Sequence, residues 1–454
     1  MTETRPGVVL AIVSLGVILS GIDLFIVNVA FPQIGAGLRV RDISDLSWLL
    51  NAYTIVFAAL LIPLGRLADR SGRKAGFLLG VGLFTVASAC CAAANSLALL
   101  IAFRALQGAG AALLTPTSLG LLLQAYPPRR RAGAVRIWTA MGSMAAVIGP
   151  VAGGLLVQAS WRWVFLVNVP VGVVAIGAGL RRLPAARGDR GPFPDIAGTV
   201  LLIAAVGAAV LALVNGNQWQ WDSARVTGLF AAAAVALALA VARSARHPSP
   251  ALDLGLLRVP GAAAALASTL LLCTAFGAMI FSLVLLAENA WGWSALRGGL
   301  AVLPNAVLVL PTAMLAGLLL GRRRVTLAAV VTAGTGLYAA GILWWRWGVH
   351  AQPAYLPHLL IGLLLTGVGL GFTMPAIFGA ATAPLPPHRF ATGSALVNMV
   401  RQVGLTLGVA VLVAVLRTPA SGAVGLAALD RGWVLIAIIT VAVPLPLIFL
   451  RKFR

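Results

Sequence analysis

Two acidic side chains, Asp23 and Glu288, are the groups of this sequence best suited to carry protons. Of the eleven Asp and Glu residues, only Asp23 lies well inside an apolar segment, and Glu288 lies at the edge of another. A charge placed in hydrocarbon costs at least about 2.5–3.5 kcal/mol, so such residues usually face a cavity, pair with a cation or carry protons. We expect Asp23 to be a proton site, with a structural ion pair as the alternative, and Glu288 to be a candidate second site.

Arg104 is the expected partner of Asp23. The two residues lie at similar depths in two apolar segments that run in opposite directions, about seven residues from the same end of each. At about 1.5 Å per residue, both lie roughly 10 Å below that surface. Gln107 falls on the helical face of Arg104. A nearby cation favours the ionised carboxylate, so separating the pair would favour protonation; the alternative for Arg104 is a side chain that reaches outward to water.

The segments that carry these residues are long and apolar. Hydrophobic residues make up 60% of the chain and charged residues 10%, a balance that excludes a water-soluble fold of this length. Fourteen apolar runs are each long enough to cross a bilayer as a helix. They lie at 8–30, 46–65, 75–95, 97–120, 136–157, 162–181, 196–214, 224–242, 262–286, 298–320, 325–345, 356–381, 393–416 and 432–450. The sequence therefore predicts an all-α integral membrane protein.

The basic residues predict the orientation. With the N-terminus inside, 23 of the 33 Lys and Arg residues lie on the cytoplasmic side and eight on the external side. This bias predicts a multi-pass protein of the cell membrane with both termini in the cytoplasm. The net charge of +22 comes from these loops, so we expect contacts with anionic membrane lipids and no nucleic acid as a partner.

An internal repeat predicts the architecture. Eight residues recur at one gapless offset of 259: Gly108, Gly110, Pro116, Gly120, Pro127, Pro128, Arg130 and Gly149 become Gly367, Gly369, Pro375, Gly379, Pro386, Pro387, Arg389 and Gly408. Repeats of this kind predict two six-helix bundles related by a pseudo-twofold axis along the membrane normal. We assign residues 1–182 to the first bundle, 183–260 to a linker with two extra helices and 261–454 to the second bundle.

The loop after the second apolar run carries the most specific motif. It reads Gly65-Arg66-Leu67-Ala68-Asp69-Arg70-Ser71-Gly72-Arg73-Lys74, in which Gly65 permits close packing and Gly72 a tight turn. This loop resembles the signature of the major facilitator superfamily. The resemblance implies that Gly65, Asp69, Arg70, Gly72 and Arg73 form a latch for one conformation.

Further motifs resemble the 14-helix drug:proton antiporters of that superfamily. The run from Gly21 to Pro32 is similar to their first-helix motif, although Phe25 replaces the usual threonine, and Glu288 stands where glutamine is common. Arg104-x-x-Gln107-Gly108 is similar to their fourth-helix motif, which the resemblance links to proton transfer. Their fifth-helix antiporter motif matches five residues: Gly142, Gly149, Pro150, Gly153 and Gly154. Taken alone, these small residues also fit ordinary helix packing.

Several polar and aromatic residues are candidates for a substrate cavity, with ordinary packing as the alternative for each. They are Phe25, Asn28, Tyr53, Gln107, Trp138, Phe276, Asn398 and Gln402. We expect no metal site and no cofactor, since the histidines and cysteines lack ligand spacing and the chain has no P-loop.

These observations predict a monomeric secondary transporter. It would export small hydrophobic compounds, such as drugs or antibiotics, in exchange for protons by alternating access. A proton-coupled uptake transporter of a small organic solute is the alternative. A membrane sensor or a membrane-embedded enzyme is disfavoured, because the chain shows neither a soluble output domain nor a nucleophile–base constellation.

Overall fold

Every regular element in the described part of the chain is a helix. The computed structural model describes residues 6–40, 42–184, 192–259, 261–321, 325–382, 390–416 and 425–449. Thirteen helices are long and apolar enough to cross a membrane. The fourteenth, α6 (Pro128–Ala159), is 32 residues long and counts as a shorter apolar helix over Ile148–Ala159. Each predicted span coincides with a helix, which confirms the predicted fold class.

The chain divides into two compact units. The first contains residues 1–40, 48–209 and 229–252, and the second contains 41–47, 210–228 and 253–454. The two extra helices, α9 (Ile196–Trp219) and α10 (Ala224–Ser244), are thus shared between the units. The boundaries at 182 and 260 stay a prediction.

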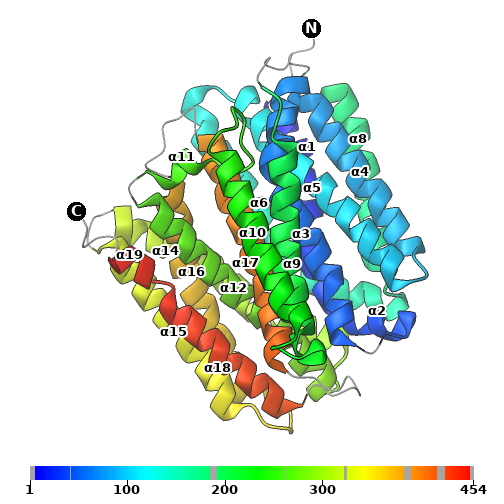
Figure 1. Ribbon diagram of the computed structural model, residues 1–454, viewed down its shortest axis with the longest axis vertical. Helices are drawn as coiled ribbons and strands as arrows, with labels where there is room; N and C mark the ends of the chain where they lie inside the picture. Colours follow the sequence, from blue (N-terminus) through cyan, green and yellow to red (C-terminus); the bar gives the residue numbers. More distant parts are fainter. Residues whose placement is uncertain are drawn as a thin grey trace. The chain divides into compact units, whose positions relative to one another are not determined.

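The first unit is built around α1, which packs on α5, α6 and α8, while α4 packs on α5 and α8. Figure 1 shows α4, α5 and α8 side by side. The helices of this part, apart from α6, α9 and α10, have the following bounds: α1 (Pro6–Val29), α2 (Phe31–Leu38), α3 (Ile43–Ser71), α4 (Arg73–Ala93), α5 (Leu97–Ala125), α7 (Trp163–Leu166) and α8 (Asn168–Arg182).

The second unit repeats this packing, with α12 on α17 and α15 on α16. Its elements are α11 (Leu254–Leu257), α12 (Ala262–Val284), the π-helix η1 (Leu285–Ala290), α13 (Ala295–Ala301), α14 (Leu303–Gly321), α15 (Leu327–Gly348), the π-helix η2 (Tyr355–Leu360), α16 (Ile361–Thr382), α17 (Phe390–Leu416), α18 (Leu426–Ala442) and α19 (Leu445–Phe449).

The repeated glycines make equivalent contacts inside each unit. A Cβ atom at Gly110 would lie 2.7 Å from the backbone nitrogen of Phe84, and one at Gly369 would lie 2.6 Å from that of Tyr338. Such distances admit only glycine, so both pairs of helices touch backbone to backbone. Three members of the repeat, Pro386, Pro387 and Arg389, lie outside the described residues.

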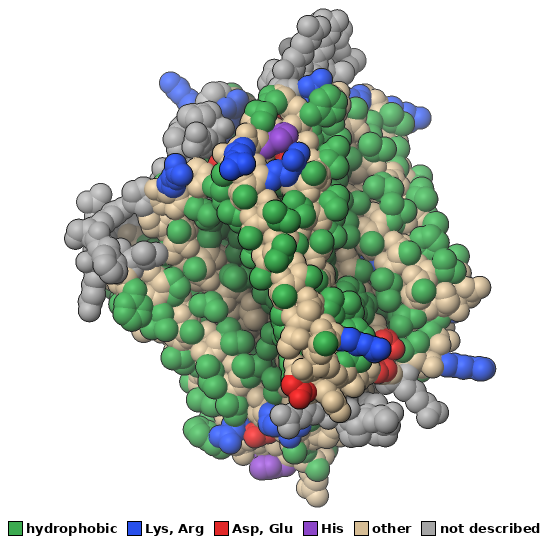
Figure 2. All heavy atoms as spheres, in the orientation of Figure 1, with side chains coloured by type: hydrophobic (Ala, Val, Ile, Leu, Met, Phe, Trp, Pro, Cys, Tyr) green, Lys and Arg blue, Asp and Glu red, His purple; other side chains and the backbone are tan. Residues whose placement is uncertain are grey.

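The face formed by α9 and α10 is apolar. Large hydrophobic side chains on both helices are exposed, among them Val200, Val235, Leu237 and Leu239. Figure 2 shows this face as mostly hydrophobic between its two ends, with Lys, Arg and His side chains at both ends. A long apolar face of this kind suits contact with lipid acyl chains.

Candidate functional site

A buried polar cluster surrounds Asp23 in the first unit. The Asp23 side chain is 0% exposed. Its Oδ2 accepts a hydrogen bond from Arg104 Nη1 at 2.5 Å, and its Oδ1 accepts from Gln107 Nε2 at 2.8 Å and from Asn168 Nδ2 at 3.1 Å. The ion pair between Asp23 and Arg104 that the sequence predicts is therefore present. We call Asp23, Ser88, Arg104, Gln107 and Asn168 the Asp23 cluster.

Neighbouring groups fix the orientation of the Gln107 amide. Its Oε1 accepts from Arg104 Nη1 at 2.6 Å, and its Nε2 also donates to Ser88 Oγ at 2.8 Å. The Ser88 hydroxyl in turn donates to the carbonyl of Phe84 at 2.8 Å. A flipped amide would set its NH₂ group against the guanidinium, so only one orientation satisfies both partners.

Arg104 has three further features. Its Nε donates to the carbonyl of Leu49 at 3.0 Å, and its guanidinium lies 4.3 Å from the centre of the Tyr53 ring. The phenol of Tyr53 donates to the carbonyl of Ser20 at 3.5 Å. Nη2 of Arg104 is buried and has no hydrogen-bond partner among the described residues. An unpartnered buried N–H is costly.

The glycines of the fifth-span motif hold α6 against the helix that carries Asp23. A Cβ atom at Gly149 would lie 2.7 Å from Cβ of Phe25, and one at Gly153 would lie 3.0 Å from Ile26. Gly142 faces Val17 in the same way, and Pro150 lies inside α6. Gly142 and Gly149 contact α1 on either side of Asp23, at Val17 and at Phe25, so a movement of α6 along α1 would act on the backbone beside the carboxylate.

The signature loop, residues 65–74, joins α3 to α4. Gly72 has φ of 108°, a left-handed conformation that favours glycine, which confirms the predicted tight turn. Asp69 is half-exposed and pairs with Arg73 at 2.6 Å, and Arg73 Nη1 donates to the carbonyl of Gly120 at 3.2 Å. Gly65 packs on Pro116, as predicted for a close approach.

The segments on either side of the α9–α10 pair contact the same loop. Arg66 Nη1 donates to Ser249 Oγ at 3.1 Å and to the carbonyl of Pro250 at 2.7 Å. The guanidinium of Arg70 lies 4.2 Å from the centre of the Phe193 ring. Asp195 accepts from Arg243 at 2.6 Å, and its N–H donates to the carbonyl of Ser249. The linkers thus occupy two arginines of the signature loop.

Burial raises the pKa of Asp195. The hydrogen bond from the Gly198 N–H and the nearby positive charge of Arg243 lower it by more, so the pKa of this carboxyl is lowered overall. Asp195 lies one residue before α9 begins, where a negative charge also favours the helix dipole.

The remaining predicted residues do not join the Asp23 cluster. Asn28 and Asn398 donate to carbonyls of their own helices, those of Leu24 and Ser394. Trp138 donates to Ser118 Oγ at 3.2 Å. Phe276 is half-buried in α12, and Glu288 is half-buried in the π-helix η1 of the second unit.

Gln402 differs from these residues. Its side chain is 0% exposed, and neither amide atom has a hydrogen-bond partner among the described residues. A primary amide that is buried with both ends unpartnered is unfavourable.

Sequence reasoning missed Asn168 and Ser88. Asn168 lies 145 residues from Asp23 along the chain, and Ser88 lies 19 residues from Gln107, each in an apolar run whose hydropathy does not predict a contact. A signal was present, because a lone asparagine two residues before a proline inside a predicted span is unusual. No group of three or more potential metal-ligating side chains occurs among the described residues.

Comparisons with known proteins identify the family of this chain. Residues 13–409 match the sequence model of the Major Facilitator Superfamily. The chain is 35% identical over 407 residues to the multidrug resistance protein Stp of Mycobacterium tuberculosis, covering 88% of this chain and 74% of that protein. It is 33% identical over 412 residues to the tetracenomycin C resistance and export protein of Streptomyces glaucescens, covering 90% and 75%.

A third relative is the methylenomycin A resistance protein of Streptomyces coelicolor, 31% identical over 418 residues, with 92% and 87% covered. Among solved structures, the POT family transporter PepTSo has a TM-score of 0.70 at 14% identity, over 98% of this chain and 97% of that one. At that identity the likeness concerns the fold alone. The match over most of the chain and the relatives agree, and the chain therefore belongs to the Major Facilitator Superfamily and is a multi-pass membrane transporter of small molecules, not an enzyme.

Proposed function

We propose that this transporter exports small, largely hydrophobic compounds, such as drugs or antibiotics, in exchange for protons by alternating access. The buried ion pair of Asp23 and Arg104 carries the proposal for the proton, and the resistance and export proteins among the relatives carry it for the substrate. Asp23 is the proton carrier, Arg104 its counter-ion, and Glu288 a second candidate near the outer mouth.

The hydrogen bonds of Asp23 explain why a proton would move the helices. The carboxylate accepts three N–H donors, so all of its contacts suit the ionised form. A proton on either oxygen would face a donor and would leave Arg104 as a lone buried charge, which is strongly unfavourable. Protonation is therefore possible only together with a rearrangement of α1 against α5, which is the coupling that an antiporter requires.

One carboxylate suggests one proton per cycle, and this sets the energy supply. A difference of one pH unit supplies about 1.4 kcal/mol per proton. A membrane potential of about 100 mV supplies about 2.3 kcal/mol per net charge moved. Export of a neutral compound for one proton uses both terms, whereas export of a monovalent cation for one proton uses only the pH difference.

The test is efflux from proteoliposomes in which the pH difference and the potential are set separately. Wild-type protein should concentrate substrate when protons flow the opposite way, and Asp23→Asn should abolish uphill transport while still permitting downhill exchange. Normal accumulation by Asp23→Asn would exclude this carrier and make Glu288 the next one to test. Uptake of substrate in the same direction as the protons would instead support the uptake alternative.

The signature loop is proposed as a conformational latch formed by Gly65, Asp69, Arg70, Gly72 and Arg73. Its support is the Asp69–Arg73 pair together with the contact of Arg73 with Gly120 on α5. Asp69→Asn should reduce turnover at unchanged expression, because it shifts a conformational equilibrium and leaves substrate contacts intact.

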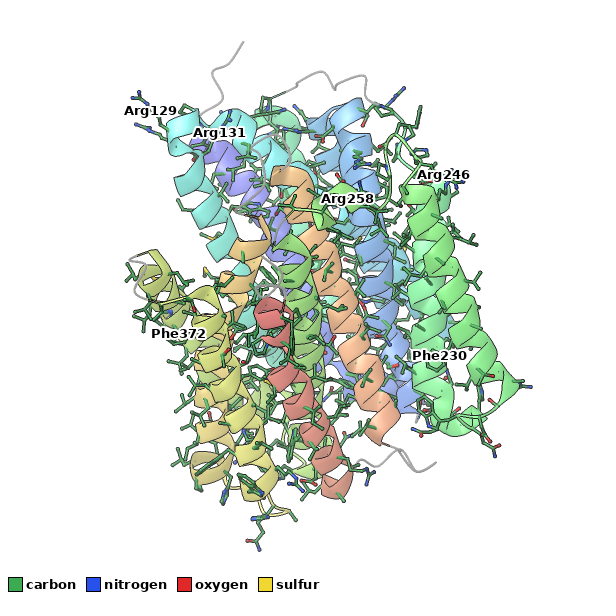
Figure 3. The ribbon with its side chains drawn as sticks, turned by 60° about the vertical axis from the view of Figure 1, so that its left-hand side comes forward. Arg129, Arg131, Phe230, Arg246, Arg258 and Phe372 are labelled. Atoms are coloured by element: carbon green, nitrogen blue, oxygen red, sulfur yellow. The ribbon has the colours of Figure 1, made fainter. Side chains whose placement is uncertain are left out.

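We further propose that the protein lies in the cell membrane as a monomer surrounded by lipid, with both termini in the cytoplasm. Figure 3 shows Arg129 and Arg131, at the start of α6, at the same end of the first unit as Arg246, just after α10. Phe230 lies further along α10, away from that end. Basic residues gathered at one end support a cytoplasmic assignment of that end.

A further inference from the structure

We propose that Asn168 is a positioning residue for Asp23, and that it links proton binding to the signature loop through α8. This inference rests on the proposed function, in which Asp23 carries the proton. Its basis is that α8 is hydrogen-bonded to the Asp23 cluster at one end and to the loop at the other.

At the first end, the Asn168 amide bonds two members of the cluster. Its Nδ2 donates to Asp23 Oδ1 at 3.1 Å and lies 3.5 Å from Ser88 Oγ, and the side chain is 2% exposed. Together with Gln107 it sets the direction of Oδ1, since two amide donors converge on that oxygen. Because an amide N–H can only donate, this contact needs an acceptor at Oδ1 and disfavours a proton on that oxygen.

Asn168 also lies where the hydrogen-bond ladder of the sixth span is interrupted, next to Val167, whose φ of −57° and ψ of −27° remain helical. The short helix α7 ends at Leu166 and α8 begins at Asn168. Pro170 has no N–H, so the carbonyl of Leu166 cannot form the helical hydrogen bond that would cross the break. A helix bends most easily where this ladder is interrupted, and here the interruption coincides with the contact to Asp23.

At the other end, the signature loop caps α8. Lys74 Nζ donates to the carbonyls of Leu180 and Leu183, each at 2.9 Å. Twelve residues separate Asn168 from Leu180, which corresponds to about 18 Å of helix. A lysine on the last carbonyls of a helix is a favourable cap, so this end of α8 is tied to residue 74.

The helix α4 joins the same two places, because it carries Lys74 in its first turn and Ser88 further along. Between them the two helices touch closely: a Cβ atom at Gly172 would clash with Thr85, and one at Gly179 would lie 2.9 Å from Leu78. The pair α4 and α8 therefore forms a closely packed connection between the carboxylate and the loop.

Protonation of Asp23 removes one attachment of α8 and leaves the other. A proton on Oδ1 would point at the N–H group of Asn168, so the hydrogen bond between them would be lost. The Asn168 amide would then keep only the longer contact with Ser88. The span can then bend at Val167, between α7 and α8, while Lys74 still bonds the C-terminal end of α8. A change of protonation at Asp23 therefore alters the position of the signature loop.

Few other charged or titratable groups face Asp23. Among the described side chains they are Arg104 of α5, Cys91 of α4, which lies 3.9 Å from Gln107, and Tyr53 of α3. The arginines of α6 lie within its first three turns, Arg162 precedes α7 and lies over Trp161, and Arg181 and Arg182 end α8.

The experiment measures proton release by the purified transporter when it binds substrate, as a function of pH. Asn168→Ala should move the midpoint to higher pH by about one unit, the size expected when a carboxylate loses one hydrogen bond. Asn168→Ser, which keeps a donor, should give a smaller shift and protects the test against poor folding of the alanine variant. Asn305→Ala is the matched control: this buried amide bonds the Leu363 carbonyl and Thr366 in the second unit, and its loss should leave the midpoint unchanged.

An unchanged midpoint in both Asn168 variants would overturn the positioning role. If both Asn168 variants behave like wild type but Asp23→Asn no longer releases a proton, only the positioning role is wrong and Asp23 is still the proton carrier. Normal proton release by Asp23→Asn would overturn the proposed function itself. The link through α8 is tested by combining Asn168→Ala with Lys74→Met. Turnover losses that are not additive support the link, and strictly additive losses exclude it.

Discussion

At the residue scale, the Asp23 cluster and Gln402 pose opposite physical problems. Each oxygen of Asp23 has a partner, so the buried charge is compensated within its unit. Gln402 is equally buried, and its amide atoms have no partner among the described side chains and backbone. A group retained at a cost to stability points to a function that needs it.

Gln402→Leu should therefore raise stability while it impairs transport. Removing an unpartnered buried amide relieves about 1–3 kcal/mol, so we expect a higher Tm for the purified protein. Affinity should fall most for substrates that offer both a donor and an acceptor. A lower Tm with unchanged affinity would show that the amide is paired in the membrane, for instance by water.

Much of the Asp23 cluster could be predicted from the sequence. Depth along two antiparallel spans was enough to pair Asp23 with Arg104, and helical spacing placed Gln107 beside them. The contacts of Asn168 and Ser88 depend on how α4 and α8 are packed, which no single span encodes. Gln107 was expected to line a cavity, and the structure shows it bonded to Asp23 and Ser88.

At the scale of elements, the packing of α1 on α6 depends on glycine. Gly149→Ala should destabilise the protein by about 1–3 kcal/mol, because its Cβ would press on Phe25 in a tightly packed contact. Gly177→Ala is the control, since nothing lies within 4 Å of a Cβ at that helical position. That change should be neutral or stabilising by up to about 1 kcal/mol. Thermal unfolding in detergent compares the two, and equal effects would contradict the packing role.

The start of α9 depends on an acidic residue. Asp195→Asn should lower the Tm at neutral pH, because it removes the charged partner of Arg243 and of the Gly198 N–H. The pKa of Asp195 is lowered by folding, so its contribution is complete above the ordinary value of 3.8 and is lost as the pH falls through the lower value of the folded protein. The difference in Tm between variant and wild type should shrink below about pH 4. A difference that is constant with pH would indicate a packing effect.

Element boundaries were predicted less completely than the elements. The spans matched helices, but the break at Val167 and the π-helical segments η1 and η2 were not expected. Hydropathy reports only that a segment is apolar, and these irregularities leave composition unchanged. Only Pro170 marks the break locally.

At the scale of the whole molecule, the two units share a scaffold but not its charges. Gly149 approaches Ile22 and Ile26 as Gly408 approaches Thr274 and Ala278, so that Asp23 corresponds to Ala275. The repeat offset pairs Arg104 with Leu363, and the matching contacts of Gly110 and Gly369 pair Ser88 with Ile342. All three counterparts are fully or almost fully buried apolar residues: Ala275, Ile342 and Leu363. The uncharged second copy supports a single deep proton site.

The orientation of the whole chain can be tested by labelling. In a background that lacks Cys90, Cys91 and Cys273, an impermeant thiol reagent added outside cells should label Asn95→Cys, in the loop before α5. It should spare Ser71→Cys in the signature loop until the membrane is opened. The reverse pattern would overturn the assignment of both termini to the cytoplasm.

The uncharged counterpart of the Asp23 cluster also limits how this chain can change under selection. Aspartate at position 275 alone would be a buried acid without the arginine that Arg104 supplies in the first unit, and arginine at position 363 alone would be a buried cation without that acid. Breaking a buried pair costs about 3–5 kcal/mol, a large part of the stability of a typical domain. Each intermediate would therefore be purged before its partner arose. A second proton site would therefore need two simultaneous substitutions, although the helices that could hold it are already present. Adaptation to new compounds should instead occur by substitution of uncharged residues such as Gln402 and Phe276.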